Sequence, residues 1–591
     1  MRNIWKVGAL GAVFGAVLSV GGCQDFDAAY ERCVSEGRCE PDGGTADGGD
    51  GGDGDGGRDS GPVDNPDCGP LVDAGVDYPD LTGQDLDCDG VDGVASAGFF
   101  VDPSDGNDEN NGSQTQPVKT LERALQLIRD GGTGRTIVYL GTGTYNEAAT
   151  VVDLPVSLYG GYTWQGHGRP YWERFKDGGG STSFEGGPLA FTVRGVTDGG
   201  VLLEGLRIAS GNATDAGEPS IALRILGTPE VRLRQVVLEA GLGAEGQAGA
   251  FGRPGTAGGK GEDGNSATNN STSGGDSVLG GTGSCATSGD LSGGRSGNGI
   301  SRGGGTPGFR GNPMARGGAG GDGGAGAALQ CNTTTETCSC TGLPGFAGDK
   351  GADGDAGTGG QPGIAELGQL QLDAGTWVAN ALQHGEQGRS GAPGAGGGGG
   401  GSGGGCADIQ VRNLDSAGSG AGGGGGAGGC SGEGGGGGMG GGASIALLLI
   451  DSNVVVEGSN QLTAMGGGSG GAGAMGGMGG DGGTGGARGQ GTSIGFTPTD
   501  GGYRTTTFGG NGGVGGAGGR GGPGGWGGGG AGGPTVNVWC ENAGITLDAG
   551  TLSLPARPGG AGGQSEAGRE GAPGLSRVVV GCTIPEGGTT P

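Results

Sequence analysis

The sequence predicts an all-β solenoid, in which short strands stack coil upon coil and long glycine-rich segments leave the stack. Two observations lead to this prediction. Spaced pairs of apolar residues recur along the chain, and glycine occupies 169 of its 591 positions. Because only 31% of the residues are hydrophobic, the chain cannot build a series of ordinary compact cores. We therefore expect the apolar residues to gather in one narrow stack.

Residues 1–22 are predicted to be a signal peptide. Arg2 and Lys6 precede an apolar run that ends in small residues, and the run is shorter than the ~20 residues of a membrane-spanning helix. The ending Val20-Gly21-Gly22-Cys23 resembles the bacterial lipobox. This resemblance implies that Cys23 carries a lipid and anchors the chain to a membrane. Gln24, in place of aspartate, implies an outer-membrane lipoprotein, and we expect it at the cell surface.

The charge of the chain narrows the class of partner. A formal net charge of -30 repels the phosphates of nucleic acids and of anionic lipids, so we expect no nucleic-acid binding. A partner recognised by electrostatics is instead a cation or a neutral polymer. We expect a polysaccharide or another polymer of the cell surface.

Residues 23–95 are predicted to form a lipid-anchored tether that ends in an acidic loop. Between Asp42 and Asp67 the chain consists largely of glycine and aspartate. Such a stretch has no apolar surface to bury, so we expect a flexible spacer with a reach of roughly 30 Å.

The acidic loop matches the first half of a calcium-binding loop. Asp85, Asp87 and Asp89 alternate with other residues, and Gly90 stands at the sixth position. Alternate carboxylates converge on a hard cation, while the glycine permits a sharp turn. With Asp92 as a further carboxylate, these four aspartates are the candidate calcium ligands.

An alternative for this loop is an acidic turn without metal, fixed by a disulfide of Cys88. The glutamate that closes a calcium-binding loop is missing, because Ser96 stands at position 12. The stretch resembles D-x-D-C-D-G-x-D-G segments that precede the main domain of other bacterial surface proteins. Both hypotheses stay open.

The cysteines predict disulfides. Without Cys23, twelve of the 13 cysteines remain in an exported chain, where thiols are oxidised. A zinc site is the alternative for three closely spaced cysteines, but neither histidine is near them in the sequence. We therefore expect disulfides that fix loops at Cys331, Cys338 and Cys340.

Residues 96–245 are predicted to hold an N-terminal cap and the first coils. Thr120–Arg129 has apolar residues at helical spacing and a capping threonine. Between Phe99 and Trp164 the segments P-V-K-T-L-x-x-A-L, I-V-Y-L-G-x-G-T-Y and L-Y-G-G-Y follow V-D-x-x-x-G-N-D. This order resembles bacterial right-handed parallel β-helix proteins of the pectate-lyase-like superfamily. The resemblance implies that fold, with the helix covering the open end of the stack.

The coil pattern is also visible in the residues alone. Apolar residues at two-residue spacing on either side of a break predict two short strands that meet at a bend. The pattern at Val201, Leu203, Leu206 and Ile208 recurs thirty residues later at Val231, Leu233, Val236 and Leu238. Residues 246–591 are predicted to add further coils, with strands at Ile409, Val411 and Leu414, at Ile445, Leu447, Leu449, Val454 and Val456, at Val536, Val538, Ile545 and Leu547, and at Val578 and Val580.

The glycine-rich segments follow these strands, so we interpret them as excursions from one corner of the coils that lie side by side. The segment 508–534 has the pattern Gly-Gly-X, with side chains at Phe508, Asn511, Val514, Ala517, Arg520, Pro523 and Trp526. A collagen triple helix needs more proline than this chain offers.

Two alternatives remain for these excursions. Ordering a residue's backbone costs ~1–2 kcal/mol, and more for glycine, which favours mobile loops. A bundle of strands that exchange hydrogen bonds, each contributing ~0.5–1.5 kcal/mol, is the ordered alternative. It resembles the polyglycine II bundles of some insect antifreeze proteins and phage adhesins.

The favoured function is a structural or adhesive surface scaffold without catalytic activity, because a lipid anchor, a spacer and an elongated stack project a surface from the cell. The superfamily resemblance implies one alternative, a polysaccharide lyase or hydrolase, but its candidate carboxylates form no catalytic motif. They are Asp153, Asp198, Glu204 and Asp215. A binder of ice or polymer through the glycine bundle is the second alternative.

Overall fold

The structure is a computed structural model that describes residues 77–583, apart from 81, 132–133, 148, 166–170, 176–180, 270, 287–288, 373, 407–414, 498–501, 548–551 and 554–556. The predicted signal peptide, Cys23, the spacer and the strand at 409–414 lie outside the described residues. The chain divides into two compact units, Met1–Gly143 with Pro155–Gly180, and Thr144–Leu154 with Ser181–Pro591.

The first unit contains a small sheet and the one α-helix among the described residues. Its elements are η1 (Ala95–Ala97), β1 (Gly98–Val101), α2 (Leu121–Gly131), β2 (Ile137–Gly141), β5 (Ser157–Trp164) and β6 (Trp172–Arg174). β1, β2 and β5 pair in parallel, and β6 runs antiparallel to β5. An aromatic cluster on this sheet contains Phe100, Tyr139, Tyr162 and Trp172.

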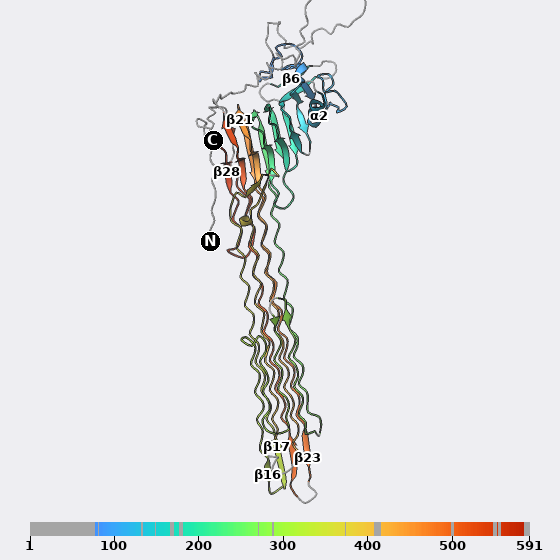
Figure 1. The fold of residues 1–591 in the computed structure, drawn as a ribbon, viewed down its shortest axis with the longest axis vertical. Coiled ribbons are helices and arrows are strands. Elements are labelled where there is room, and N and C mark those ends of the chain that lie inside the picture. The colour runs from blue at the N-terminus through green and yellow to red at the C-terminus, as the bar shows by residue number, and fades with distance from the viewer. Residues whose placement is uncertain are drawn as a thin grey trace, which may run out of the picture. The chain divides into compact units, whose positions relative to one another are not determined.

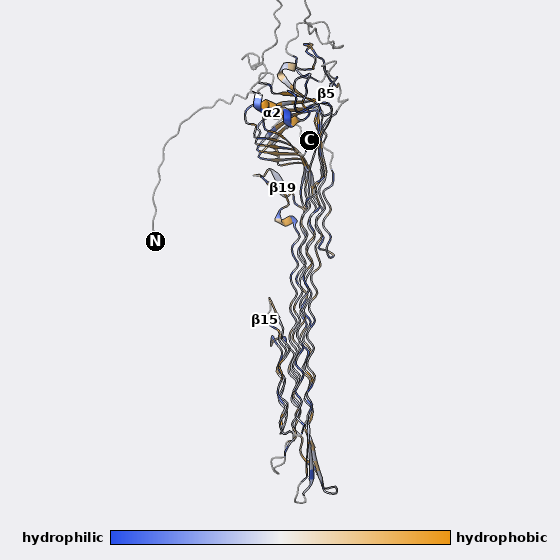
Figure 2. Cartoon of the chain, turned by 90° about the vertical axis from the view of Figure 1, so that its right-hand side faces the viewer, coloured by the Kyte–Doolittle hydropathy of each residue, from blue (hydrophilic) through white to orange (hydrophobic). Residues whose placement is uncertain are grey.

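α2 confirms the predicted helix. It buries Leu121, Ala124 and Leu125, and the Thr120 hydroxyl accepts a hydrogen bond from the Arg123 N–H at 3.2 Å. In Figure 2, α2 carries both hydrophobic and hydrophilic residues. No helix within the described ranges is long and apolar enough to cross a membrane.

The second unit is the predicted all-β solenoid, a parallel β-helix. Its coils contribute strands to three parallel sheets. The first contains β9 (Val201–Glu204), β12 (Val231–Arg234), β21 (Asn453–Glu457) and β26 (Gly544–Leu547). The second contains β3 (Gly143–Tyr145), β7 (Thr182–Gly186), β10 (Leu206–Ser210), β13 (Val237–Leu242), β22 (Asn460–Gly466) and β27 (Leu552–Ser553). The third contains β4 (Thr150–Val152), β8 (Leu189–Arg194), β11 (Ser220–Leu226), β20 (Ser444–Ile450), β25 (Thr535–Glu541) and β28 (Ser576–Val580).

The register of the first sheet confirms the predicted thirty-residue repeat. Val231 lies opposite Val201, and Leu233 lies opposite Leu203. Val454 of the next coil lies opposite Val231, although the glycine-rich segments separate these residues in the sequence. The apolar side chains therefore stack into ladders through the core.

The glycine-rich segments all leave the coils between the second and the third sheet, after β13, β22 and β27. In the described residues they form six long arms, and Figure 1 shows these arms side by side. The arms are residues 246–267 (arm 1), 342–363 (arm 2), 384–405 (arm 3), 418–442 (arm 4), 467–491 (arm 5) and 509–533 (arm 6). Shorter segments at 274–283, 291–299, 305–312, 317–327, 559–564 and 569–574 pair with them.

Hydrogen bonds between the arms recur at every third residue, so the glycine-rich segments form an ordered bundle. Arm 1 donates to arm 5 from Gly246 to Ser469 and from Gly249 to Ala472, and this continues to Ala267 and Gln490. A backbone with three residues per turn points successive N–H groups in three directions. In the centre of the bundle, Gly397, Gly398 and Gly399 accordingly donate to three different neighbours, at Gly426, Asp349 and Phe309.

Each group of three residues along an arm has one residue on each of the three sides of the arm. The number of glycines in such a group matches the number of sides that neighbouring segments cover. Residues 394–405 of arm 3 are buried, and 396–401 are all glycine. Arm 6 has the predicted Gly-Gly-X pattern, with Val514, Ala517 and Arg520 exposed. Arms 1 and 2, at the edge, are Gly-X-Y over long stretches and so differ from the predicted Gly-Gly-X. Arm 1 becomes Gly-Gly-Lys where Gly259 donates to Thr282 of a covering strand.

Small sheets and disulfides fix the loops of the arms. β16 (Gln330–Asn332), β17 (Thr337–Thr341), β24 (Arg504–Phe508) and β23 (Ser493–Phe496) form a sheet at the far end of the bundle. Short hairpins join β14 (Ser284–Cys285) to β15 (Gly289–Asp290), and β18 (Gln369–Gln371) to β19 (Thr376–Val378), which precedes η3 (Ala381–Gln383). The predicted disulfides are confirmed in place of zinc, as Cys331–Cys338 and Cys340–Cys406, and two further bonds are Cys285–Cys430 and Cys540–Cys582.

We predict that Gly516→Ala destabilises the bundle. A Cβ at Gly516 would overlap the carbonyl oxygen of Asp349, and such overpacking costs about 1–3 kcal/mol. At a site with free space, Gly→Ala would instead stabilise the protein by about 0.4–1 kcal/mol, because it lowers the conformational entropy of the unfolded chain. The sign of the change in unfolding free energy therefore shows whether the arms are closely packed at Gly516. Denaturant unfolding measures the difference. The neighbouring exposed Ala517→Val is the control, and a Gly516→Ala protein as stable as the parent would contradict close arm packing.

Candidate functional site

The acidic loop before β1 brings three carboxylates together. Asp77, Asp85 and Asp87 each place one carboxylate oxygen within 4.8 Å of the others, and they are the one such group of three or more His, Cys, Asp or Glu residues in the part of the chain that the structure describes. Asp77 and Asp85 are 1% and 6% exposed. The loop therefore concentrates negative charge in a mostly buried place.

Backbone amides hold these carboxylates. Asp77 Oδ2 accepts from the N–H groups of Leu86 and Gly93 at 3.1 and 3.2 Å, and Asp85 Oδ2 accepts from Gly90 at 2.9 Å. Gly90 has φ +98°, as the sharp-turn argument predicts. Asp77 Oδ1 is buried and has no hydrogen-bond partner.

Of the four predicted ligands, the structure places Asp85 and Asp87 in this cluster and directs the other two elsewhere. Asp89 accepts from the Ala95 N–H at 2.6 Å. Asp92 Oδ2 lies 3.5 Å from Arg174 Nη1, and both side chains are buried. Asp77 was missed because it precedes the motif by eight positions and belongs to no recognised spacing.

Burial raises the pKa values of the loop's carboxyls. Desolvation is the largest cause in each case, and neighbouring carboxylates add to it. The pKa rises from 3.8 to about 6 for Asp77 and Asp87 and to about 8 for Asp89. The pKa of Asp92 rises to about 7, although Arg174 opposes the rise.

The rest of the first unit holds this loop in position. The Tyr162 hydroxyl donates to the Asp92 carbonyl at 2.7 Å, and the Tyr139 hydroxyl donates to the Val94 carbonyl at 3.1 Å. Cys88 is disulfide-bonded. The end of the loop is therefore tied to the aromatic cluster of the sheet.

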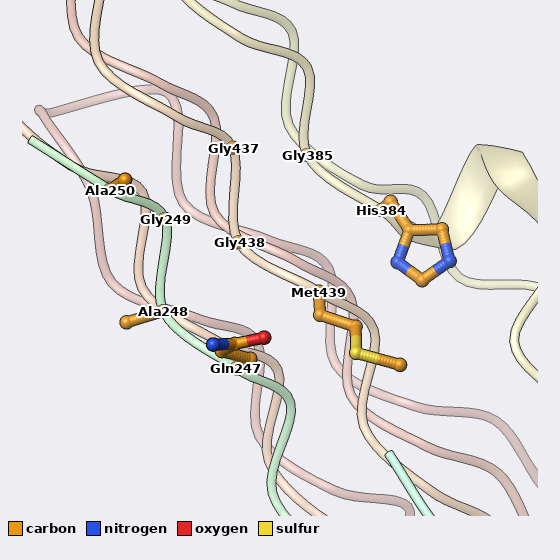
Figure 3. Close-up of a pocket in the computed structure, with 9 residues that line it drawn as sticks. All are labelled: Gln247, Ala248, Gly249, Ala250, His384, Gly385, Gly437, Gly438 and Met439. Carbon is orange, nitrogen blue, oxygen red and sulfur yellow. The ribbon is translucent and has the colours of Figure 1, made fainter. Parts of the chain in front are cut away.

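A second feature is a cavity of about 360 Å³ in the bundle near the coils. Figure 3 shows Gln247 on arm 1 and His384 on arm 3, with Met439 of arm 4 between them. His384 Nδ1 accepts from the Gly440 N–H at 3.0 Å, so its other nitrogen carries the proton in the neutral ring. Most of the remaining lining is glycine and alanine backbone.

None of the candidate catalytic carboxylates belongs to a group of three or more potential metal ligands in the described residues. Glu204 is fully buried and lies 2.9 Å from Arg234 Nη1, while Arg234 Nη2 lies 2.8 Å from Glu457. These three residues occupy facing positions on consecutive strands β9, β12 and β21. Their alternating charges therefore hold neighbouring coils together.

Comparison with known families matches a segment near the start of the described residues. Residues 104–188 match the model of a family described as "Protein of unknown function (DUF1565)", a family associated with parallel β-helix proteins. Neither a curated protein nor a solved structure matches the chain. The match therefore agrees with the fold and adds no activity.

We predict that, in the absence of divalent cations, the first unit loses stability as pH rises from about 4 to about 8.5. Asp77, Asp87, Asp89 and Asp92 have raised pKa values in the folded state. Such carboxyls contribute stability below their unfolded pKa and lose it as pH rises through the folded values. Thermal unfolding in chelator, followed by near-ultraviolet circular dichroism, measures this dependence. A melting temperature that rises over this range would contradict it.

Proposed function

We propose that the protein is a surface lipoprotein, anchored through Cys23, that acts as a structural or adhesive scaffold without catalytic activity. The observation that carries the proposal is the bundle, in which arms exchange backbone hydrogen bonds at every third residue. Such a bundle projects its loops away from the coils and offers an extended surface to a partner.

The physical properties of the bundle suit this role. Arm 4, residues 418–442, spans roughly 75 Å at the rise of 3.1 Å per residue typical of an extended three-fold backbone. Each interarm hydrogen bond contributes only ~0.5–1.5 kcal/mol, but the repeated bonds resist bending together. Disulfides such as Cys285–Cys430 and Cys340–Cys406 pin the arms in an oxidising environment.

The partner that we propose is a neutral polymer of the cell surface, such as a polysaccharide. The net charge of -30 disfavours anionic partners. The exposed X positions of arm 6 vary from apolar Val514 to charged Arg520, which suits many weak contacts along a polymer. The predicted flexible spacer between Asp42 and Asp67 would let the scaffold reach such a partner from the membrane.

A polysaccharide lyase or hydrolase remains the competing function. Those reactions need close carboxylates or a carboxylate-bound calcium beside a base. Glu204, the fully buried candidate, serves an ion pair with Arg234. This use of the side chain favours the scaffold over the enzyme.

We predict that Cys23→Ala moves the protein from the membrane fraction to the soluble exported fraction, because the lipid anchor is lost. Surface labelling of intact cells should detect the parent protein, with Cys33→Ala as the matched cysteine control that stays in the membrane.

The purified chain from Asp25 should bind members of a glycan array without releasing unsaturated or reducing sugar ends. Sustained sugar release would contradict the scaffold hypothesis and favour the enzyme. A Cys23→Ala protein that stays in the membrane fraction would contradict the lipid anchor at Cys23.

A further inference from the structure

We propose that Asp77, Asp85 and Asp87 form a calcium site in the first unit, with Asp77 as a ligand that lies outside the sequence motif. The site differs from the one that the motif predicts, because the ligand set gains Asp77 and omits Asp89 and Asp92. This inference is independent of the proposed scaffold function.

The first argument is the distance between the oxygens. Two oxygens bound to one Ca²⁺ at 2.3–2.6 Å lie at most about 5 Å apart. One oxygen from each of the three carboxylates lies within 4.8 Å of the other two. Three oxygens this close to one another can bind a single ion with small movements of their side chains.

The second argument is the unpartnered oxygen of Asp77. This side chain is 1% exposed, and its Oδ1 has no hydrogen-bond partner, whereas its Oδ2 accepts from two backbone N–H groups. A buried carboxylate oxygen without a partner is costly. A cation between the three carboxylates removes this cost and their mutual repulsion.

The chemistry of the donors selects the metal. All three are carboxylate oxygens, which suit calcium and other hard cations, whereas zinc in proteins favours nitrogen and sulfur ligands. Asp87 is exposed, so water can reach the ion and complete its shell. Exported modules bind calcium with dissociation constants of about 10⁻⁴ to 10⁻³ M, and we expect a value in this range.

Calcium at this place would close the loop from Asp77 to Gly93. Asp77 already joins Leu86 and Gly93 through its Oδ2, and Asp85 joins Gly90. Because Tyr162 holds the Asp92 carbonyl, an ion that orders the loop also steadies its attachment to the sheet. The expected result is a calcium-dependent rise in the stability of the first unit.

Isothermal titration calorimetry with CaCl₂ tests the proposal, using the chain from Asp25 to its last residue. We expect one ion per chain and at least tenfold weaker binding for both Asp77→Asn and Asp87→Asn. Asp87 is exposed, so its substitution leaves folding intact and keeps the test valid if Asp77→Asn fails to fold. Asp105→Asn, an exposed aspartate of the same unit, is the control and should bind like the parent. The absence of binding at 10 mM calcium, or unchanged binding by Asp87→Asn or by folded Asp77→Asn, would overturn the site.

Discussion

The close approach of peptide backbones, which only glycine permits, is the constraint on which the bundle depends. A Cβ on Gly434 would overlap the carbonyl oxygen of Gly388 on the neighbouring arm. Without side chains in the way, each arm donates N–H groups to carbonyls on several sides. A backbone that is costly to order is thus ordered by hydrogen bonds rather than by an apolar core.

This constraint explains the composition of each arm from its place in the bundle. A side chain fits only on a face that no other arm covers. Arm 3 follows this rule along its own length. At its start, every third residue carries a side chain on a face that no other segment covers, as at His384, Gln387 and Ser390. Further along, shorter segments cover that face, and every third residue is mostly glycine. Side chains also replace missing strands, as His384 does by accepting from the Gly440 N–H.

The sequence predicted those parts that are local or carried by side chains. The pairs at Val201 and Val231, the helix α2 and the three-residue period of arm 6 follow from short-range patterns. Which arms are neighbours could not be predicted, because glycine carries no side-chain pattern that distinguishes one partner from another. Asp77 was missed for a related reason, since a loop and not a spacing rule brings it to Asp85.

The pairing of strands in the coils fixes the register of the glycine-rich arms. An arm with a three-residue repeat could slip by one triplet and make the same hydrogen bonds. Arms 1 and 5, however, continue the pairing of β13 with β22, from Leu242 opposite Gly466 to Gly246 donating to Ser469. Arms 4 and 6 likewise lead into the pairing of β20 with β25. The apolar ladders of the solenoid thus set the alignment, and the glycine bundle extends it.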